Sequence, residues 1–190
     1  MNQGKTYVNT TNKWSVILFG LAVFCTLALP SVVRADEWDQ ATKLTFSGPV
    51  EVPGQVLSAG TYWFKLADSE SDRNIVQIWN ADRTQMLTTI LAISDYRQKT
   101  PEKTIINFEE TPSGQPEAIQ SWFYPGNNFG EEFVYPKTRA RQLSKQSGKP
   151  VLSMPDEQGS NARQIKRAPV TAVNPSGDEA ALATSPSPEK

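Results

Sequence analysis

The chain is most constrained by a series of short segments in which apolar and polar residues alternate, each ended by a turn sequence. Alternation with a period of two is typical of a β-strand with one buried face. The clearest pair is Thr61–Leu66 (TYWFKL) and Asn74–Asn80 (NIVQIWN), with the polar loop Asp68–Asp72 between them. These two segments predict an antiparallel hairpin.

The register of this hairpin is predicted from the two faces of its strands. A slip by one residue would turn Lys65 and Gln77 inward, so the favoured register is the one in which every inward residue is apolar. The pairs expected are Tyr62 with Ile78 and Phe64 with Val76.

Segments of the same kind recur along residues 41–136 and give about seven or eight short strands. The other segments are Ala41–Ser47, Val50–Val52, Gln85–Ile93, Lys103–Glu109, Ala118–Tyr124 and Glu131–Tyr135. Gln85–Ile93 is the longest apolar run, and we interpret it as a central strand with both faces partly covered. A helix is the alternative there, but adjacent threonines and the lack of a capping signal disfavour it. The pattern predicts an all-β fold, an antiparallel β-sandwich of the Ig-like or prealbumin-like kind.

Aromatic residues are densest in Ile119–Pro136 (IQSWFYPGNNFGEEFVYP). Pro125–Asn128 and Gly130 are typical turn residues. Because the composition changes after Pro136, we interpret this segment as the last piece to pack against the β domain.

The two ends of the chain differ from this middle part. Residues 1–35 have the pattern of a signal peptide, with basic residues before an apolar run and Val33–Ala35 at the expected cleavage site. An uncleaved anchor is the alternative, and it is the only membrane contact expected. Residues 141–190 are rich in Pro, Ser and Gln and are predicted to be a disordered tail, with a helical turn considered over Arg139–Lys149. The predicted domain is therefore 36–140, exported to the periplasm or the extracellular space.

Composition excludes several chemistries. The chain has no His, and its single cysteine, Cys25, lies in the predicted signal peptide. A Ser-His-Asp triad, a Cys-His nucleophile and a His- or Cys-ligated zinc are therefore ruled out. No glycine-rich phosphate loop occurs, and no cofactor is expected. Acidic residues outnumber basic ones in 36–136 and the reverse holds after 137, which argues against nucleic acid as a partner.

Carboxylates remain as candidate reactive groups. Glu109–Glu110 and Glu131–Glu132 are acidic doublets, but neighbours on a strand point to opposite faces, so neither doublet is a facing pair. A carboxylate-dependent glycan hydrolase is kept as the alternative function. Asp68, Glu70 and Asp72 are spaced like a weak metal site, for which a solvated hairpin loop is the simpler interpretation.

Aromatic side chains give the candidate contact surface. Trp63 and Trp79 are expected on the outward face of the hairpin, diagonal to each other. If that face is open, the two rings form a flat platform for a sugar ring or an apolar partner. If it is covered, they belong to the core, and we favour this second interpretation because large aromatic side chains are usually mostly buried. The other candidates for contact lie in the aromatic segment: Trp122, Tyr124, Asn127, Asn128 and Phe129.

Three stretches also carry a resemblance. Val52–Leu66 (VPGQVLSAGTYWFKL), Asp68–Asn80 (DSESDRNIVQIWN) and Ser121–Lys137 (SWFYPGNNFGEEFVYPK) resemble a family of uncharacterised secreted bacterial β-rich proteins. The resemblance covers the whole predicted domain and implies an exported β-rich protein. It brings no activity, ligand or catalytic residue.

These observations together favour a non-enzymatic protein. We expect an exported binding or scaffolding module of the cell envelope or extracellular space, with an envelope protein or a glycan as its partner. Two acids facing each other across a cleft would instead favour the hydrolase.

Overall fold

The computed structural model describes residues 40–68, 73–157 and 161–182. All of them belong to the second of the two units into which the chain divides, Asp36–Lys190. The signal peptide predicted for residues 1–35 lies outside the described residues.

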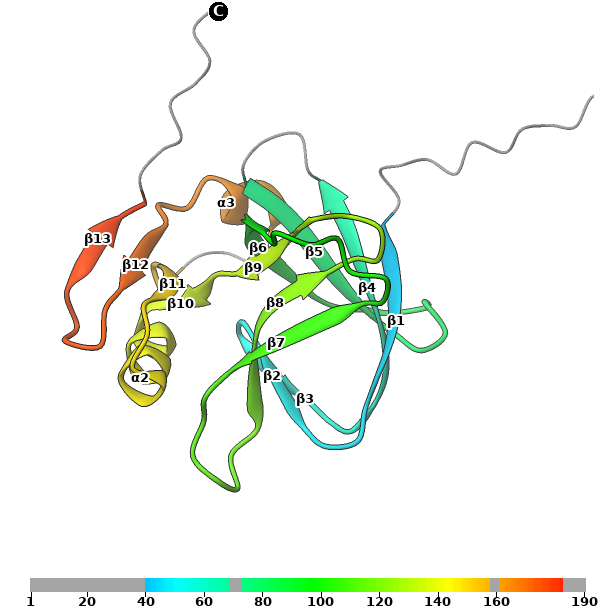
Figure 1. Cartoon of the computed structure of the whole chain (residues 1–190), viewed down its shortest axis with the longest axis horizontal. Coiled ribbons are helices and arrows are strands. Elements are labelled where there is room, and N and C mark those ends of the chain that lie inside the picture. The colour runs from blue at the N-terminus through cyan, green and yellow to red at the C-terminus, as the bar shows by residue number, and fades with distance from the viewer. Residues whose placement is uncertain (1–39, 69–72, 158–160, 183–190) are drawn as a thin grey trace, which may run out of the picture. The chain divides into compact units, whose positions relative to one another are not determined.

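Nine strands of the described part form one mixed sheet (Figure 1). They are β1 (Ala41–Phe46), β2 (Val50–Val52), β3 (Gln55–Leu57), β4 (Gly60–Asp68), β5 (Arg73–Asn80), β6 (Met86–Tyr96), β7 (Ile105–Glu109), β8 (Glu117–Phe123) and β9 (Phe129–Phe133). Their order across the sheet is β1-β4-β5-β6-β9-β8-β2-β3, and β7 pairs with β8. Of these pairs only β2 and β8 run parallel.

The sheet is strongly curved around the ring of Phe64. Strands β4 and β8 are separated by three other strands, which in a flat sheet would place them about 19 Å apart. The rings of Phe64 on β4 and Trp122 on β8 nevertheless lie 6.1 Å apart between centroids. Phe64 also stacks at 6.3 Å on Phe133 of β9. The inner face of the sheet therefore closes on itself and forms the main core.

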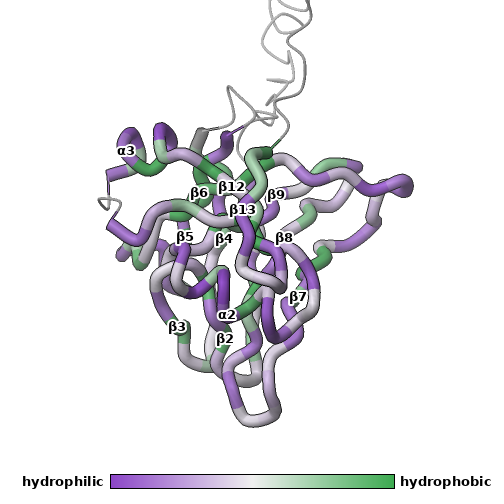
Figure 2. The backbone as a smooth tube through the Cα atoms, turned by 90° about the vertical axis from the view of Figure 1, so that its left-hand side faces the viewer, coloured by the Kyte–Doolittle hydropathy of each residue, from purple (hydrophilic) through white to green (hydrophobic). Residues whose placement is uncertain are grey.

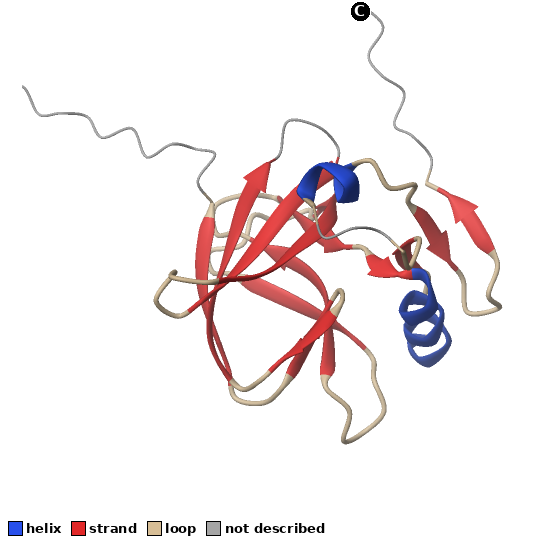
Figure 3. Cartoon of the chain, turned by 180° about the vertical axis from the view of Figure 1, so that it is seen from behind, coloured by secondary structure: helices blue, strands red, loops and turns tan. Residues whose placement is uncertain are grey.

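The C-terminal part forms a second, smaller sheet with two helices (Figure 3). Its elements are β10 (Tyr135–Pro136), α2 (Lys137–Ser147), β11 (Val151–Met154), α3 (Ala162–Lys166), β12 (Thr171–Val173) and β13 (Glu179–Ala181). The strands follow one another in sequence order, with β10 parallel to β11 and the other pairs antiparallel.

Strands β5 and β6 are apolar on both faces, and each face packs into a different cluster. Val76 and Ile90 point into the main core, which also contains Leu143 of α2. Ile75 and Leu91 point the other way, into a second cluster formed with side chains of β11, α3 and the segment after α3. In Figure 2 hydrophobic segments lie around β6 and β12, between more hydrophilic outer loops. The C-terminal part thus covers the outer face of the central strands.

Polar contacts hold the C-terminal part on the main sheet. The buried hydroxyl of Tyr135 donates to the carbonyl of Ile119 at 2.8 Å and reaches that of Glu51 at 3.3 Å. The Arg139 guanidinium makes two bonds to the Glu51 carboxylate, of 2.7 and 2.6 Å. Tyr135 begins β10, two residues after the end of β9, and Arg139 lies in the first turn of α2. Their hydrogen bonds therefore fix the direction in which the chain leaves the sheet.

Helix α2 begins without a side-chain cap of its own, since its N-cap is Pro136. The carboxylate of Asp156 supplies the missing acceptor from beyond β11, taking bonds from the Thr138 amide at 2.9 Å and its hydroxyl at 2.6 Å. A carboxylate at a helix N-terminus also interacts favourably with the helix dipole. The start of α2 is therefore tied to the end of β11.

The structure confirms a mostly β fold and corrects three predictions. The strands do not form an antiparallel sandwich, because one curved sheet contains the parallel pair β2–β8 and a second small sheet adds β10–β11. The hairpin faces are as expected but its register differs by two residues: Phe64 lies opposite Ile78 and Tyr62 opposite Asn80. A shift of two leaves every side chain on its predicted face, so alternation alone cannot detect it.

The predicted disordered tail at 141–190 is wrong for 141–157 and 161–182. These residues contribute Leu143, Val151 and Val173 to the main core and Leu152 and Ile165 to the second cluster. The domain therefore continues well beyond the predicted end at 140, while 158–160 and 183–190 lie outside the described residues. The helical turn considered at 139–149 is confirmed as α2.

The Tyr135 hydroxyl gives a direct test of this docking. Tyr135→Phe should lower the free energy of unfolding by about 1–2 kcal/mol, because it removes a donor to buried carbonyls and leaves them unsatisfied. The measurement is urea unfolding followed by tryptophan fluorescence. Tyr124→Phe is the control, since no hydrogen bond of the half-buried Tyr124 hydroxyl is found in the described part. Equal effects of the two changes would contradict the role given to Tyr135.

Candidate functional site

The two predicted platform residues, Trp63 and Trp79, lie directly opposite each other on neighbouring strands rather than diagonally. Both are half-buried, so they are neither core residues nor freely exposed rings. Together with Ala41, Lys65 and Arg83 they line a surface hollow of about 150 Å³. The outward face of β1, β4 and β5 is therefore open at this point.

The loop between β5 and β6 supplies Arg83 to the hollow, and hydrogen bonds of Asn80 stabilise its conformation. The Asn80 side chain accepts hydrogen bonds from the backbone amides of Thr84 at 2.9 Å and Gln85 at 3.2 Å, and it donates to the Thr84 hydroxyl. Arg83 has a φ of 56°, the one positive φ among the described non-glycine residues. This conformation is unfavourable for a residue with a side chain, and such strain persists where the surroundings enforce it, often at binding sites.

The strained loop places a cation on an aromatic ring. The guanidinium carbon of Arg83 lies 3.5 Å from the centroid of the Trp63 ring. The indole N–H of Trp63 donates to the Ala81 carbonyl of the same loop at 3.1 Å, which fixes the ring. Trp63 and Arg83 are therefore held in place before any ligand arrives.

The charge around the hollow is positive. Lys65 and Arg83 line it, and Lys43 lies opposite Trp63 on β1 with an exposed side chain. This is notable in a part of the chain where acidic residues outnumber basic ones. Aromatic faces next to cations suit a ring that carries a negative group.

The other predicted contact residues differ in how far the structure buries them. Trp122 is 1% exposed and packs against Phe64, so its predicted role as a contact residue is wrong. Tyr124 and Asn127 are half-buried, whereas Asn128 and Phe129 are exposed. These four residues form a turn near the β8–β9 connection and none lines the hollow of Trp63 and Trp79.

The glycan hydrolase kept as the alternative function would need two carboxylates that face each other, so the positions of Glu109, Glu131 and Glu132 matter here. Glu131 is buried next to the Asn74 side chain, which donates to it at 2.7 Å. Burial, together with the negative charges of Asp95 and Glu109, raises the pKa of Glu132 to about 7. The charges of Glu109 on β7 and Glu132 on β9 therefore interact, although β8 lies between these two strands. Neither acid lines the hollow of Trp63 and Trp79.

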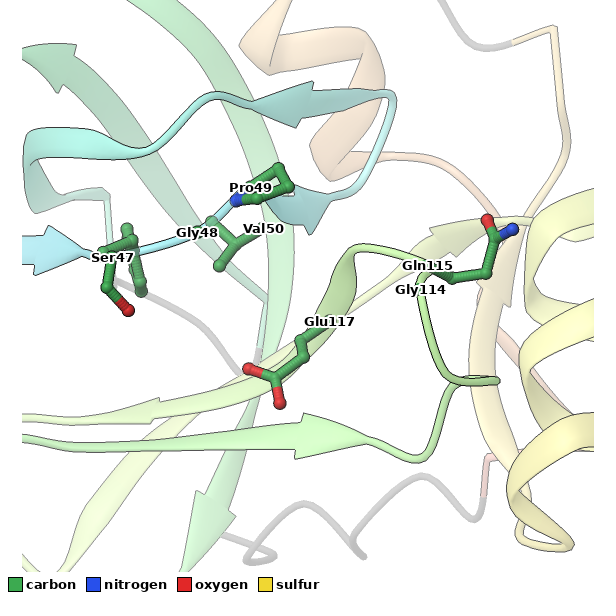
Figure 4. A pocket seen from close by; sticks show the side chains of 8 residues that line it. Ser47, Gly48, Pro49, Val50, Gly114, Gln115 and Glu117 are labelled. Carbon is green, nitrogen blue, oxygen red and sulfur yellow. The ribbon is translucent and has the colours of Figure 1, made fainter.

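A second hollow, of about 340 Å³, lies between the β1–β2 loop and the turn before β8 (Figure 4). Ser47 and Glu117 approach it from these two segments, while Gln115 points away from them. Glu117 is the single carboxylate of its lining. This hollow therefore lacks the pair of acids that glycoside hydrolysis requires.

The weak metal site cannot be followed in full, because Glu70 and Asp72 lie outside the described residues and Asp68 is placed only as the last residue of β4. Within the described ranges there is no group of three acidic side chains able to hold a metal ion. Neither helix of the described part is long and apolar enough to cross a membrane.

Compared with known proteins, the chain matches no family model, no curated protein and no solved structure. The resemblance to secreted bacterial proteins thus stays a prediction, and the function has to be argued from the geometry of this chain.

Sequence reasoning found the two tryptophans of the hollow but missed its cations. The positive φ of Arg83 has no signal in the sequence, because glycine or asparagine usually occupies such positions. Lys65 was assigned to the outward face without a role. Tyr96, 72% exposed and opposite Phe129, was also missed.

Glu131 gives a pH test of the interior. Burial raises its pKa to about 7, which the hydrogen bond from Asn74 opposes in part. Between about pH 4.5 and 7 the folded protein keeps this proton while the unfolded chain releases it, so stability should fall as pH rises through this window. Glu131→Gln should make the fall less steep and raise the free energy of unfolding at pH 8 by about 2–3 kcal/mol.

The measurement is chemical unfolding at pH 5, 6, 7 and 8. Glu117→Gln, a change at an exposed carboxylate, is the control and should leave the pH profile unchanged. A Glu131→Gln profile parallel to that of the unmodified protein would contradict the assignment.

Proposed function

We propose that this protein is an exported, non-enzymatic binding module of the cell envelope or extracellular space, and that it binds an acidic glycan at the hollow of Trp63 and Trp79. The observation that carries the proposal is the Arg83 guanidinium, stacked 3.5 Å from the Trp63 ring by a loop with a strained backbone. A site that is ordered before binding loses little conformational entropy when a ligand arrives.

The dimensions and chemistry of the hollow narrow the ligand class. At about 150 Å³ it is smaller than the sites that enclose whole drug-sized molecules, so it suits a single ring of a larger molecule. Because Arg83 covers a face of Trp63, a sugar ring packs on the indole of Trp79, and a carboxylate on that ring pairs with Arg83. A uronic acid residue within a polysaccharide combines these two features.

Binding is favoured over the alternative, a carboxylate-dependent glycan hydrolase. The hydrolase has one observation in its support, the neighbouring acids Glu109 and Glu132. A hydrolase also needs room for a sugar between its two carboxylates, and neither acid lines a hollow described above. The alternative therefore has a candidate pair of acids but no substrate site.

Arg83→Gly separates binding from stability. Glycine adopts the positive φ without strain, which offsets the lost cation–π contact of about 0.5–1 kcal/mol, so the melting temperature should change little. Affinity for polygalacturonate, measured by calorimetry on the purified protein, should fall roughly tenfold or more. Arg97→Ala is the matched control, because Arg97 lies over another ring, that of Phe123, outside the hollow.

Two results would contradict the proposal. One is binding of polygalacturonate that is equally strong in the Arg83→Gly variant, or absent from the unmodified protein. The other is cleavage of a glycan that is lost on Glu132→Gln, which would support the hydrolase instead.

A further inference from the structure

A groove follows the edge of strand β6, away from the hollow of Trp63 and Trp79. Five consecutive residues, 86–90, line it, together with the Pro53–Gly54 turn and four residues of the C-terminal part: Pro136, Met154, Asp156 and Ile165. Its volume is about 430 Å³. Because successive side chains of a strand point to opposite faces, a groove that touches five in a row runs along the strand edge rather than over one face.

The backbone along this edge has no partner strand. On the side away from β5, strand β9 pairs with β6 from Ala92 to Tyr96. The last bond of this series runs from the Val134 amide to the Leu91 carbonyl at 2.9 Å, after which the chain turns away into β10. Backbone groups two residues apart point the same way. The N–H and C=O of Thr89 therefore point into the groove, and no backbone bond to them on this side occurs in the described part.

The side chains of this edge do nothing to prevent pairing. Natural edge strands are usually guarded by charges, by proline or by a bulge. No charged residue occurs between Arg83 and Asp95. The pairing of β5 with β6 is irregular at Leu87, where Ile78 lies opposite Thr88 and Trp79 opposite Met86. Beyond that irregularity, the residues of β6 along the groove are uncharged and open to another strand, and the one carboxylate of the lining, Asp156, is bonded to Thr138.

We propose that this groove binds an extended, uncharged peptide segment of a partner protein, which adds to β6 as a strand in line with β9. Beyond the irregularity, the free edge of residues 88–90 is about 10 Å long, at roughly 3.3 Å per residue, so it pairs with a segment of similar length. The edge lies between the Pro53–Gly54 turn and the C-terminal part. Such walls admit a single chain but hinder the sheet edge of a second folded copy.

The test is selection of random octapeptides, displayed on phage, against the purified full chain. Enriched peptides should be uncharged and rich in β-branched residues, and one of them, made synthetically, serves as the probe. Thr89→Pro removes the N–H that points into the groove and leaves the bonds to β5 in place, so it should weaken probe binding roughly tenfold or more. Thr89→Val keeps the N–H and is the matched control, with binding expected within about twofold.

A second measurement does not depend on the folding of the proline variant. In the unmodified protein, the bound probe should slow hydrogen exchange of the Thr89 amide roughly tenfold or more. Failure to enrich any peptide, or unchanged exchange at Thr89 with the probe bound, would overturn the proposal. A concentration-dependent dimer that Thr89→Pro dissociates would also overturn it, because a second copy would then be the occupant.

Discussion

Strands β5 and β6 carry buried apolar side chains on both faces, and this constraint determines the rest of the structure. A sheet that is apolar on both sides must be covered on both sides. The inner face is covered by the sheet itself, which curves until Phe64 meets Trp122 across three intervening strands, together with side chains of the C-terminal part such as Leu143. The outer face, with Ile75 and Leu91, is covered by the C-terminal part. Each fully buried Leu or Ile there contributes about 1.5–3 kcal/mol, which favours docking over a free tail.

The two proposed sites both lie where this covering stops. The C-terminal part packs on the outer face at Ile75 and Leu91 but not at the tryptophans, so the hollow stays open toward the outside. On the other side of β6, strand β9 ends at Phe133 and the chain turns into β10, which leaves the edge at Thr89 unpaired. The bonds of Tyr135 and Arg139 fix that turn. The groove is therefore a consequence of how the C-terminal part leaves the main sheet.

Local pattern was enough to predict most strands of the main sheet, but not the short β3 or the strands β11–β13 of the C-terminal part. Non-local contacts were not predictable from it. Alternation placed Phe64, Trp63 and Trp79 on their correct faces, but the register was shifted by two, which preserves the faces. Gly130 was read as a turn residue, whereas it lies in β9, where a Cβ would come within 2.5 Å of the Phe123 ring. The tail was called disordered because its apolar residues are scattered. Several of these residues nevertheless pack on the outer face of β6. The apolar run Gln85–Ile93 had predicted a strand covered on both faces, but not which part of the chain covers it.

Hydrogen exchange of the purified protein, read by mass spectrometry, tests most directly whether the C-terminal part belongs to the domain. Amides of β11 and β12 should exchange as slowly as those of β5, within about tenfold, because both would open only when the whole domain unfolds. Exchange of β11 and β12 at the rate of an unfolded peptide, with β5 still protected, would show that the tail is free. The second cluster and the edge groove would then not exist as described.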